Sequence, residues 1–509
     1  MEWSRATEEA ARIAARWTAE GGPGGAIVLF NGRHIHAEAF GGLASLELNL
    51  PFTAETVVRY ASISKHFCAS LLLRLQAEGV LSLNDTLGAH LPMLPRAPGS
   101  VPIARALDMT GGLPDTMETL WLLGVPWSAA LDRHALLDFI GSVDALNFAP
   151  GSEVSYSNTG YRLIEAALTL KSLSYFNALR ERFFRPLGLT IGLPEDETEP
   201  VPYLAAGYWR DDNVWRRGRY GLHFSASGGL AGSARDLATW LMALMTGQSP
   251  AEDLLAPLGA RRRLDDGTQT DYGLGLARSP LPGEIAVGHG GSLPGYKNHF
   301  LLLPERKAGV VVTSNREDTD AHGVALQVLA ALTGSDLPEA AQGLLPQGLF
   351  AAEKGPFWIE HAGGELTFLG AVERLFKDED ACAVTRSAHL PARLRHVPGG
   401  IAGEIGHVAR TFAPVAGDIA LPKSWEGEFV CEQHDARCSI TRGAGGVQLA
   451  IGTGPLRVTM SLTPLDAHRA LTEHRAGPWR QRACLGLNPR TRTLRMVTNR
   501  SRVLQFRKV

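Results

Sequence analysis

Ser62 and Lys65 stand three residues apart, at the start of a segment that continues with the leucine-rich run Leu71–Leu75. Residues at i and i+3 share one face of a helix, so this pattern predicts a buried helix that holds the amine beside the hydroxyl. An alcohol is a weak nucleophile at neutral pH and needs a base. Lysine can be that base when burial or the positive end of a helix lowers its pKa. Because Ser-x-x-Lys occurs about once or twice by chance in such a chain, the prediction of a nucleophile depends on further partners.

A second group of polar side chains, Tyr156 and Asn158, follows a Pro-Gly turn in an irregular segment between predicted helices. Alternate residues of an extended segment point the same way, so both side chains can face one site. A phenol can relay protons between Ser62, Lys65 and a leaving group, and an amide can hold the lysine nitrogen and bind a substrate carbonyl. Taken alone, such a tyrosine is more often a half-buried packing residue.

A third segment, His289-Gly290-Gly291-Ser292, comes at the end of a predicted strand. Glycines let a substrate backbone approach closely, which assigns Gly290 and Gly291 to substrate binding. We expect the backbone N–H groups of Ser62 and Ser292 to form an oxyanion hole, because acyl transfer needs donors aimed at the developing oxyanion. Alone, a His-Gly-Gly segment is more often a turn with a surface histidine.

Strands from both ends of residues 1–335 are expected to form one sheet. An N-terminal amphipathic helix precedes a hairpin whose Asn31-Gly32 turn suits type I′. Later strands are expected at Ile285–Gly288, His299–Leu303 and Val310–Thr313, and helices at Ala69–Gln76, Tyr161–Leu170, Ala178–Phe184 and Leu237–Met245. This order predicts an α+β domain: an antiparallel sheet with a helical insert, and a cleft where the two parts meet.

The sequence changes in character after Thr333. Residues 336–348 are rich in Pro, Gly and Gln and predict a linker. Beyond them, short strand-like pieces separated by glycine turns replace the helical patterns. We predict two small antiparallel β-barrels or sandwiches, at residues 349–415 and 420–509. A ligand-carrying barrel is one alternative for them, and a gate over the cleft is the favoured one.

The bulk composition is that of a globular protein whose partner is a small molecule or a peptide. The 509 residues are 45% hydrophobic and 20% charged, with a formal net charge of −2, which predicts no nucleic-acid partner. Neither a secretory signal nor an apolar run of the ~20 residues that span a bilayer is visible, so we expect a cytoplasmic protein with no membrane partner. Five scattered cysteines predict free thiols. His34 and His36 have no further ligand at suitable spacing, so we expect no metal and no cofactor.

Together and in this order, the three segments resemble the motifs of the penicillin-recognising serine hydrolases, which include serine β-lactamases, D-alanyl-D-alanine carboxypeptidases, esterases and D-aminopeptidases. The likeness covers about residues 20–335 and is greatest to bacterial D-aminopeptidases, which also have a third-motif histidine followed later by two β-barrels. The resemblance implies a β-lactamase-type catalytic domain and a homodimer. It also implies these roles: acylated nucleophile for Ser62, base for Lys65, proton relay for Tyr156, positioning of lysine and substrate for Asn158, and third-motif residue for His289.

In the similar D-aminopeptidases, a loop of the last domain supplies an acidic group for the free amine of the substrate. The candidate here is Glu473, although Arg475 nearby would repel an ammonium. A neutral His289, in place of the usual lysine, favours substrates without a free carboxylate. We therefore predict a serine hydrolase that releases N-terminal D-amino acids from small peptides, amides or esters. The alternatives are an esterase or amidohydrolase without the amine requirement, and a catalytically silent binding or scaffold protein.

Overall fold

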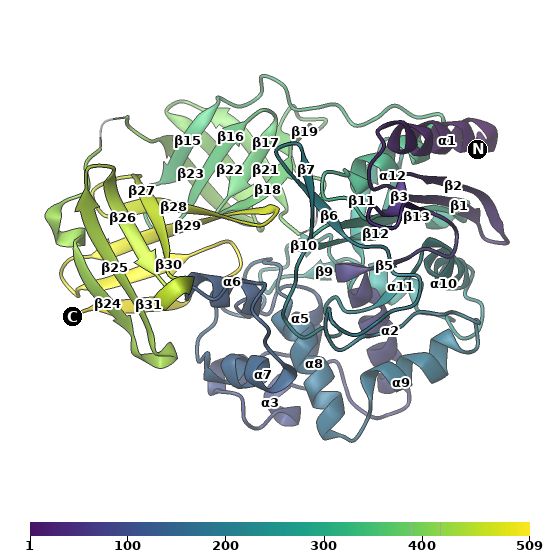
Figure 1. Cartoon of the computed structure of the whole chain (residues 1–509), viewed down its shortest axis with the longest axis horizontal. Helices are drawn as coiled ribbons and strands as arrows, with labels where there is room; N and C mark the ends of the chain where they lie inside the picture. The colour runs from purple at the N-terminus through teal and green to yellow at the C-terminus, as the bar shows by residue number, and fades with distance from the viewer. Residues whose placement is uncertain (388, 418) are drawn as a thin grey trace.

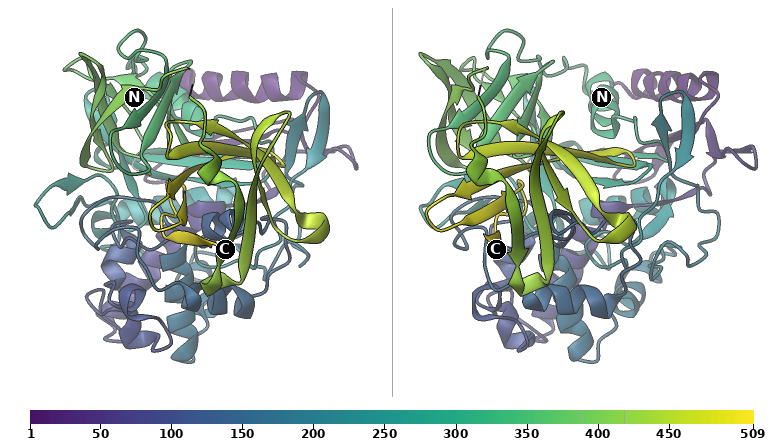
Figure 2. Two further views of the ribbon diagram at one scale, coloured as in Figure 1. Left: turned by 90° about the vertical axis from the view of Figure 1, so that its left-hand side faces the viewer. Right: turned by 60° about the vertical axis from the view of Figure 1, so that its left-hand side comes forward.

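Three parts follow one another along the chain and lie side by side (Figure 1): a mixed α and β domain, a nine-stranded sheet and a closed barrel. The computed structural model describes residues 1–387, 389–417 and 419–509. The two turned views show that both β parts cover one side of the first domain (Figure 2).

A six-stranded antiparallel sheet forms the centre of the first domain. Its strand order is β11-β12-β13-β14-β1-β2, so the N-terminal β1 pairs with β14 from the far end of the domain, with Val28 opposite Val311. This pairing confirms the sheet that the two ends of the domain were expected to form. The strands are β1 (Gly25–Asn31), β2 (Ile35–Gly41), β11 (Ala277–Leu281), β12 (Glu284–Leu293), β13 (Tyr296–Leu303) and β14 (Ala308–Ser314).

Helices cover both faces of this sheet. Successive side chains of a strand point to opposite faces, so an apolar strand needs a cover on each side. On β1, Ile27 and Leu29 pack in the cluster of α1 and α12, whereas Val28 and Phe30 pack in the cluster of α2 and α10. A strand that is buried on both faces has a continuous run of apolar residues in its sequence, and β1 has such a run. The four helices are α1 (Trp3–Ala19), α2 (Ser64–Ala77), α10 (Ala234–Thr246) and α12 (Ala321–Thr333).

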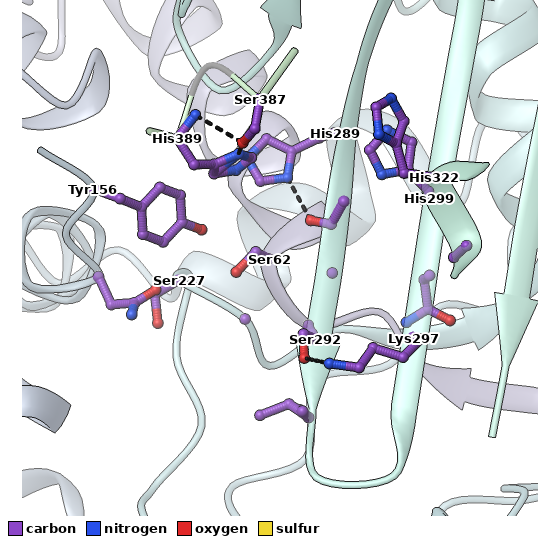
Figure 3. Close-up of a pocket in the computed structure, with 18 of the residues that line it drawn as sticks. Ser62, Tyr156, Ser227, His289, Ser292, Lys297, His299, His322, Ser387 and His389 are labelled. Carbon is purple, nitrogen blue, oxygen red and sulfur yellow. Dashed lines mark hydrogen bonds between the residues drawn. The ribbon is translucent and has the colours of Figure 1, made fainter. Parts of the chain in front are cut away.

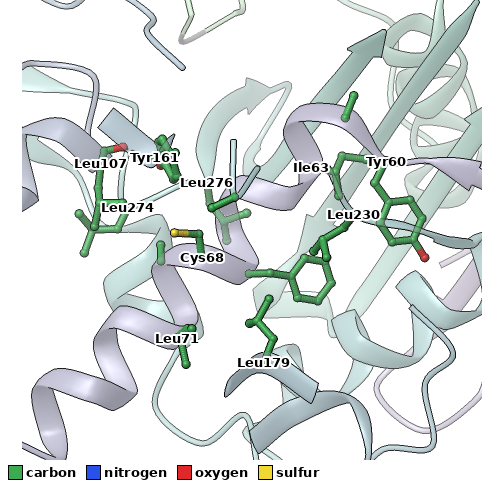
Figure 4. Close-up of a cluster of buried hydrophobic side chains, with 14 of the residues drawn as sticks. Tyr60, Ile63, Cys68, Leu71, Leu107, Tyr161, Leu179, Leu230, Leu274 and Leu276 are labelled. Atoms are coloured by element: carbon green, nitrogen blue, oxygen red, sulfur yellow. Dashed lines mark hydrogen bonds between the residues drawn. The ribbon is translucent and has the colours of Figure 1, made fainter. Parts of the chain in front are cut away.

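The rest of the first domain is the helical insert, and α2 runs through its core. Cys68 and Leu71 of α2 pack among Tyr161, Leu179 and Leu230 from other elements (Figure 4). Every residue of α2 from Ser64 to Leu72 is buried, which fixes the N-terminal end of the helix in space. The insert and its short strands comprise α3 (Leu87–His90), α4 (Arg96–Gly99), α5 (Ile103–Leu107), α6 (Thr116–Leu122), α7 (Arg133–Ser142), α8 (Thr159–Leu170), α9 (Tyr175–Leu179), α11 (Leu255–Gly259), β3 (Leu43–Ser45), β4 (Leu50–Pro51), β5 (Val57–Arg59), β6 (Tyr208–Asp211), β7 (Val214–Arg217), β8 (Ala231–Ser233), β9 (Arg262–Arg263) and β10 (Gln269–Thr270).

The middle part is one antiparallel sheet that nearly closes on itself, in the order β18-β17-β16-β15-β23-β22-β21-β20-β19. Its strands are β15 (Gly348–Ala352), β16 (Trp358–Ala362), β17 (Glu365–Phe368), β18 (Ala371–Arg374), β19 (Phe376–Lys377), β20 (Ala383–Val384), β21 (Ala392–Val397), β22 (Gly400–Ile405) and β23 (Val408–Pro414). Two antiparallel barrel-like sheets after an α+β domain confirm the predicted fold class.

The last part is a closed barrel in which each strand pairs with the next and β31 returns to β24. Its strands are β24 (Gly427–Cys431), β25 (Ala436–Gly443), β26 (Gly446–Ile451), β27 (Val458–Pro464), β28 (Arg469–Ala476), β29 (Trp479–Asn488), β30 (Thr493–Val497) and β31 (Leu504–Lys508). The cysteines, two of which lie in this barrel's first hairpin, are free and buried as predicted.

The first hairpin differs from the two-residue turn expected for Asn31-Gly32. Strand β2 begins only at Ile35. The side-chain oxygen of Asn31 accepts the N–H groups of Arg33 and His34 at 2.8 and 3.1 Å. Asn31 also donates its backbone N–H to the carbonyl oxygen of His34, and Gly32 lacks the positive φ that type I′ requires, so this turn is built by the asparagine side chain instead.

A buried ion cluster joins the three parts. Glu153, in the segment that leads to Tyr156, accepts N–H groups from Arg502 of the barrel at 2.8 and 3.0 Å. It also pairs with Arg410 of the middle sheet at 3.3 Å, and all three side chains are buried. The segment before Tyr156 is therefore held by both β parts.

Candidate active site

Ser62 lies where the backbone turns into α2. It belongs to the short 3-10 turn Ala61–Ile63 directly before the helix, and Ala61 has a φ of 53°, in the left-handed region that disfavours a residue with a Cβ. Strand β12 crosses this turn closely, since a Cβ on Gly291 would lie 2.0 Å from the carbonyl oxygen of Tyr60. Glycine at position 291 is thus what allows the third motif to pass beside the nucleophile.

Lys65 is fully buried behind Ser62. Its Nζ lies 3.1 Å from Ser62 Oγ. It also lies 2.8 Å from Asn158 Oδ1 and 2.5 Å from the carbonyl oxygen of Ser227. Burial lowers the pKa of Lys65 well below its ordinary value, although the charge of Asp115 opposes this. A neutral amine has two N–H groups and one lone pair; the two carbonyl-type oxygens occupy the N–H groups, which leaves the lone pair for the Ser62 hydroxyl.

Asp115, which the sequence analysis missed, orients Asn158. As the N-cap of α6 it accepts the backbone N–H groups of Met117 and Glu118 with one oxygen. Its other oxygen accepts the backbone N–H and the side-chain Nδ2 of Asn158, both at 2.8 Å. The amide oxygen of Asn158 must then face Lys65. The available signal was an acidic residue followed three positions later by Glu118, a pattern typical of helix starts.

The hydroxyl of Tyr156 points toward Ser62 (Figure 3). It is buried and has no hydrogen-bond partner among the residues that the structure describes. Burial raises the pKa of Tyr156 above its ordinary value, so the phenol stays protonated near neutral pH. Buried hydroxyls are normally paired, and this one is free to bond to a ligand beside Ser62.

His289 forms a neutral wall of the site. Its Nδ1 lies 2.6 Å from the carbonyl oxygen of Gly290, which can only accept, so Nδ1 carries the proton and Nε2 accepts from the Tyr272 hydroxyl at 2.8 Å. Burial, with His389 and Lys65 nearby, lowers the pKa of His289 well below its ordinary value. Both ring nitrogens are therefore engaged by the protein, and the catalytic role assigned to His289 stays a prediction.

The end of β12 forms a strand edge beside Ser62. Pairing with β11 stops at Gly288, and residues 289–293 continue against β13 alone. An edge strand offers unpaired backbone groups to a ligand. The side chain of Ser292 accepts from Lys297 at 2.8 Å, and Lys297 also pairs with Glu317 at 2.8 Å. The oxyanion-hole assignment of the Ser62 and Ser292 N–H groups fits this edge and stays a prediction.

A cavity of about 680 Å³ opens over these residues, and all three parts of the chain line it. This volume suits a small substrate. The sequence-predicted side chains in its wall are Ser62, Tyr156, Asn158, His289 and Ser292, together with Gly290 and Gly291. Among the residues that the structure describes, no group of three or more His, Cys, Asp and Glu is arranged to hold a metal ion. None of the helices it describes has the length and apolar character needed to cross a membrane.

His389 enters the cavity from the middle sheet and was not foreseen. Its ring centroid lies 4.6 Å from that of Tyr156 and 4.8 Å from that of His289. Burial lowers its pKa to about 3, so this imidazole is neutral as well. His389 is a single histidine in the loop between β20 and β21, and its sequence neighbourhood carries no signal of such a position.

Glu473 lies outside the cavity, so the structure gives no support to its predicted role in binding the substrate amine. It belongs to strand β28 and forms ion pairs with Arg480 at 2.6 Å and Arg482 at 3.6 Å. The same hairpin does reach the cavity, through Trp479 at the start of β29. The Trp479 ring stacks edge-on against Trp127 with centroids 4.3 Å apart.

The fold and the site define the class of the protein. The Beta-lactamase family model matches residues 10–335, more than half of the chain, so the chain belongs to this family. Within it, the chain is 28% identical over 316 residues to the D-aminopeptidase of Gluconobacter oxydans (strain 621H), covering 62% of this chain and 59% of that protein. It is 27% identical over 392 residues to the D-aminopeptidase of Cereibacter sphaeroides (strain ATCC 17023), covering 75% of this chain and 70% of that protein.

Two solved structures have the same fold. An octameric penicillin-binding protein homologue from Pyrococcus abyssi aligns with a TM-score of 0.57 at 19% identity and covers 97% of this chain and 98% of its own. A D-amino acid amidase from Ochrobactrum anthropi SV3, solved with D-phenylalanine, aligns with a TM-score of 0.55 at 21% identity and covers 65% of this chain and 99% of its own. The first likeness extends over the two β parts, and the second is confined to about two thirds of the chain.

Proposed function

We propose that this protein is a serine hydrolase that releases N-terminal D-amino acids from small peptides, amides or esters through an acyl-enzyme. The observation that carries the proposal is the contact between Lys65 Nζ and Ser62 Oγ at the floor of the cavity. The D-aminopeptidases among its relatives support the substrate class. The cytoplasmic location and the homodimer expected from the sequence stay predictions.

In acylation, Ser62 Oγ attacks the carbonyl carbon of the scissile bond and its proton passes to the Lys65 lone pair. The negative charge that develops on the carbonyl oxygen would be held by the N–H groups of Ser62 and Ser292. The bond from carbon to the leaving nitrogen or oxygen then breaks. The leaving atom takes the proton from Lys65, with the Tyr156 hydroxyl as relay.

In deacylation, water adds to the ester carbon of acylated Ser62. Lys65, again neutral, accepts a proton of that water, and the same proton returns to Ser62 Oγ as the ester bond breaks. The products are the free D-amino acid and the regenerated hydroxyl. Because the Tyr156 hydroxyl has no described protein partner, it can bond to the leaving group in the first half and to the water in the second.

Hydrolysis rates on three chromogenic substrates test this proposal: D-alanine p-nitroanilide, L-alanine p-nitroanilide and a short p-nitrophenyl ester without an amine. We expect kcat/KM for the D-anilide to exceed that for the L-anilide by at least about a hundredfold, as differential transition-state binding of two enantiomers allows. Turnover of the ester alone would favour the esterase alternative. Absence of turnover, with Ser62 unmodified by an acylating probe in mass spectrometry, would favour a binding or scaffold protein.

Trp479 tests the gating role expected of the β parts. Its indole Nε1 donates to Glu317 of the first domain at 3.0 Å, so the barrel hairpin is fastened to that domain at the wall of the cavity. Trp479→Ala removes a large side chain from the wall, and we expect kcat/KM for D-tryptophan p-nitroanilide, relative to D-alanine p-nitroanilide, to rise about tenfold, the worth of one steric contact in a pocket.

Trp209→Ala is the matched control for that experiment. Trp209 packs against Arg475 of the same hairpin, 5.6 Å from the guanidinium carbon, but does not line the cavity. The ratio of the two rates should stay at the wild-type value in this variant. An unchanged ratio in Trp479→Ala, or an equal rise in both variants, would contradict the gate.

A further inference from the structure

The loop between β30 and β31 of the barrel is seated in the first domain by its backbone. The carbonyl oxygen of Arg500 accepts the N–H of Asp115 at 2.8 Å and the side-chain amide of Asn147 at 2.9 Å. On either side, the carbonyl oxygen of Asn499 accepts from Ser155 at 3.1 Å, and other loop residues bond to the same domain. These contacts place the Arg500 side chain in the active site without using its charge.

The guanidinium of Arg500 faces the cavity with its donors unused. Its central carbon lies 4.7 Å from the centroid of the Tyr156 ring. Its Nε forms an ion pair with Glu118 Oε1 at 3.6 Å, a distance longer than a hydrogen bond. No described residue accepts a hydrogen bond from this side chain, which is 32% exposed and lines the cavity. An arginine fork with free donors in a partly buried wall fits a planar anion such as a carboxylate.

The carboxyl groups around Arg500 keep it charged without accepting a hydrogen bond from its side chain. Burial disfavours the charged form, yet Glu118 and Asp115 outweigh this and raise the pKa of Arg500. Both oxygens of Asp115 already accept hydrogen bonds, one from the N–H of Met117 and the other from Asn158. Burial raises the pKa of Glu118, and it raises the pKa of Glu373 to about 7, which weakens the negative charge of Glu373 near neutral pH.

Three other basic side chains of the site, His289, Lys65 and Lys297, are not free in the same way. His289 is neutral, and Lys65 uses its N–H groups on protein oxygens. Lys297 is bound to Glu317 and Ser292. The third motif has a neutral histidine where a lysine is usual. A positive charge is instead supplied by Arg500 of the barrel, beside Tyr156, which we propose protonates the leaving group.

We propose that Arg500 binds a carboxylate on the leaving group of the substrate, so that the site prefers dipeptides with a free C-terminus to amino acid amides. This rests on the proposed function, in which Tyr156 protonates the leaving nitrogen. The carboxylate of a single leaving residue lies about one residue length, ~3.5 Å, from that nitrogen. Arg500 lies against the same tyrosine ring, 4.7 Å from its centroid, so we expect the carboxylate of a one-residue leaving group to be within its reach. The neutral His289 alone would predict no such preference for a carboxylate.

The test compares D-Ala-Gly with D-Ala-glycinamide, which differ only in the terminal charge, in the wild type, Arg500→Gln and Arg500→Lys. The readout is the ratio of the two kcat/KM values. In the wild type we expect a ratio of about 10 to 100 in favour of the acid, the worth of a charge-assisted hydrogen bond. Arg500→Gln should bring the ratio close to one, and Arg500→Lys should keep part of it because the charge remains without the fork.

Glu118→Gln combined with Arg500→Gln separates substrate binding from a merely structural role. If Arg500 only balanced Glu118, the single variant would lose rate on both peptides alike and the double variant would recover it. The proposal expects the ratio to stay near one in both. A wild-type ratio near one, or a ratio unchanged in Arg500→Gln, overturns the carboxylate site while leaving the proposed function intact. No turnover of either peptide or of D-alanine p-nitroanilide overturns the proposed function and this inference with it.

Discussion

Lys65→Met is expected to lower kcat/KM on D-alanine p-nitroanilide by about 10²- to 10⁴-fold, the range that a general base contributes. Methionine fills most of the buried space but offers no lone pair to Ser62, which then keeps its proton. The oxyanion donors and the cavity remain, so residual activity is expected. Steady-state kinetics measure the effect, and thermal unfolding shows whether the variant still folds with two carbonyl oxygens left unpaired.

The pH dependence of kcat/KM shows whether the loss of activity in Lys65→Met comes from loss of the base. Activity needs neutral Lys65, so kcat/KM of the wild type should fall as the pH drops through the lysine pKa. Because burial lowers that pKa well below its ordinary value, this limb should lie far below the ~10.4 of a free lysine. The limb should vanish in Lys65→Met. Lys171→Met, at an exposed lysine, should keep both the rate and the limb. A Lys65 variant with near wild-type kcat/KM would exclude lysine as the base.

Local spacing was enough to predict the core of the site. Ser62 and Lys65 are three positions apart at a helix start, and that relation depends only on helix geometry. Asn158 bonds to Lys65 as expected. The pairing of β1 with β14 also followed from alternation and from strand signals at both ends of one domain. In each case neighbouring residues and a regular period carried the information.

The sequence did not predict which residues of the two β parts reach the cavity. Arg500 and His389 reach the cavity because separate β parts dock on the first domain, and nothing in their own neighbourhoods marks them. Glu473 shows the converse: its strand register puts it opposite Arg482, which draws its charge away from the site. The hairpin that contains Glu473 was predicted to serve the cleft, and it does reach the cavity, but through Trp479.

Docking of the β parts should depend strongly on Glu153. Glu153→Gln leaves Arg502 and Arg410 buried without their counter-charge, and breaking a buried ion pair in this way costs about 3 to 5 kcal/mol. We expect the first unfolding transition in urea to move to a clearly lower midpoint. Since Glu153 begins the segment that holds Tyr156, and the barrel loop with Arg500 lies against the same segment, kcat/KM should fall in the same variant.

Glu473→Gln is the matched control, because Glu473 also faces two arginines, Arg480 and Arg482, but with a side chain 43% exposed. Solvent screens such a pair, so its loss should cost no more than about 1 kcal/mol and leave the midpoint close to the wild type. The residue types and the substitution are the same, so the two variants differ in burial and in whether the ion pairs join separate parts of the chain. Equal midpoints for the two variants would mean that the ion cluster does not hold the three parts together, and that apolar packing between them does.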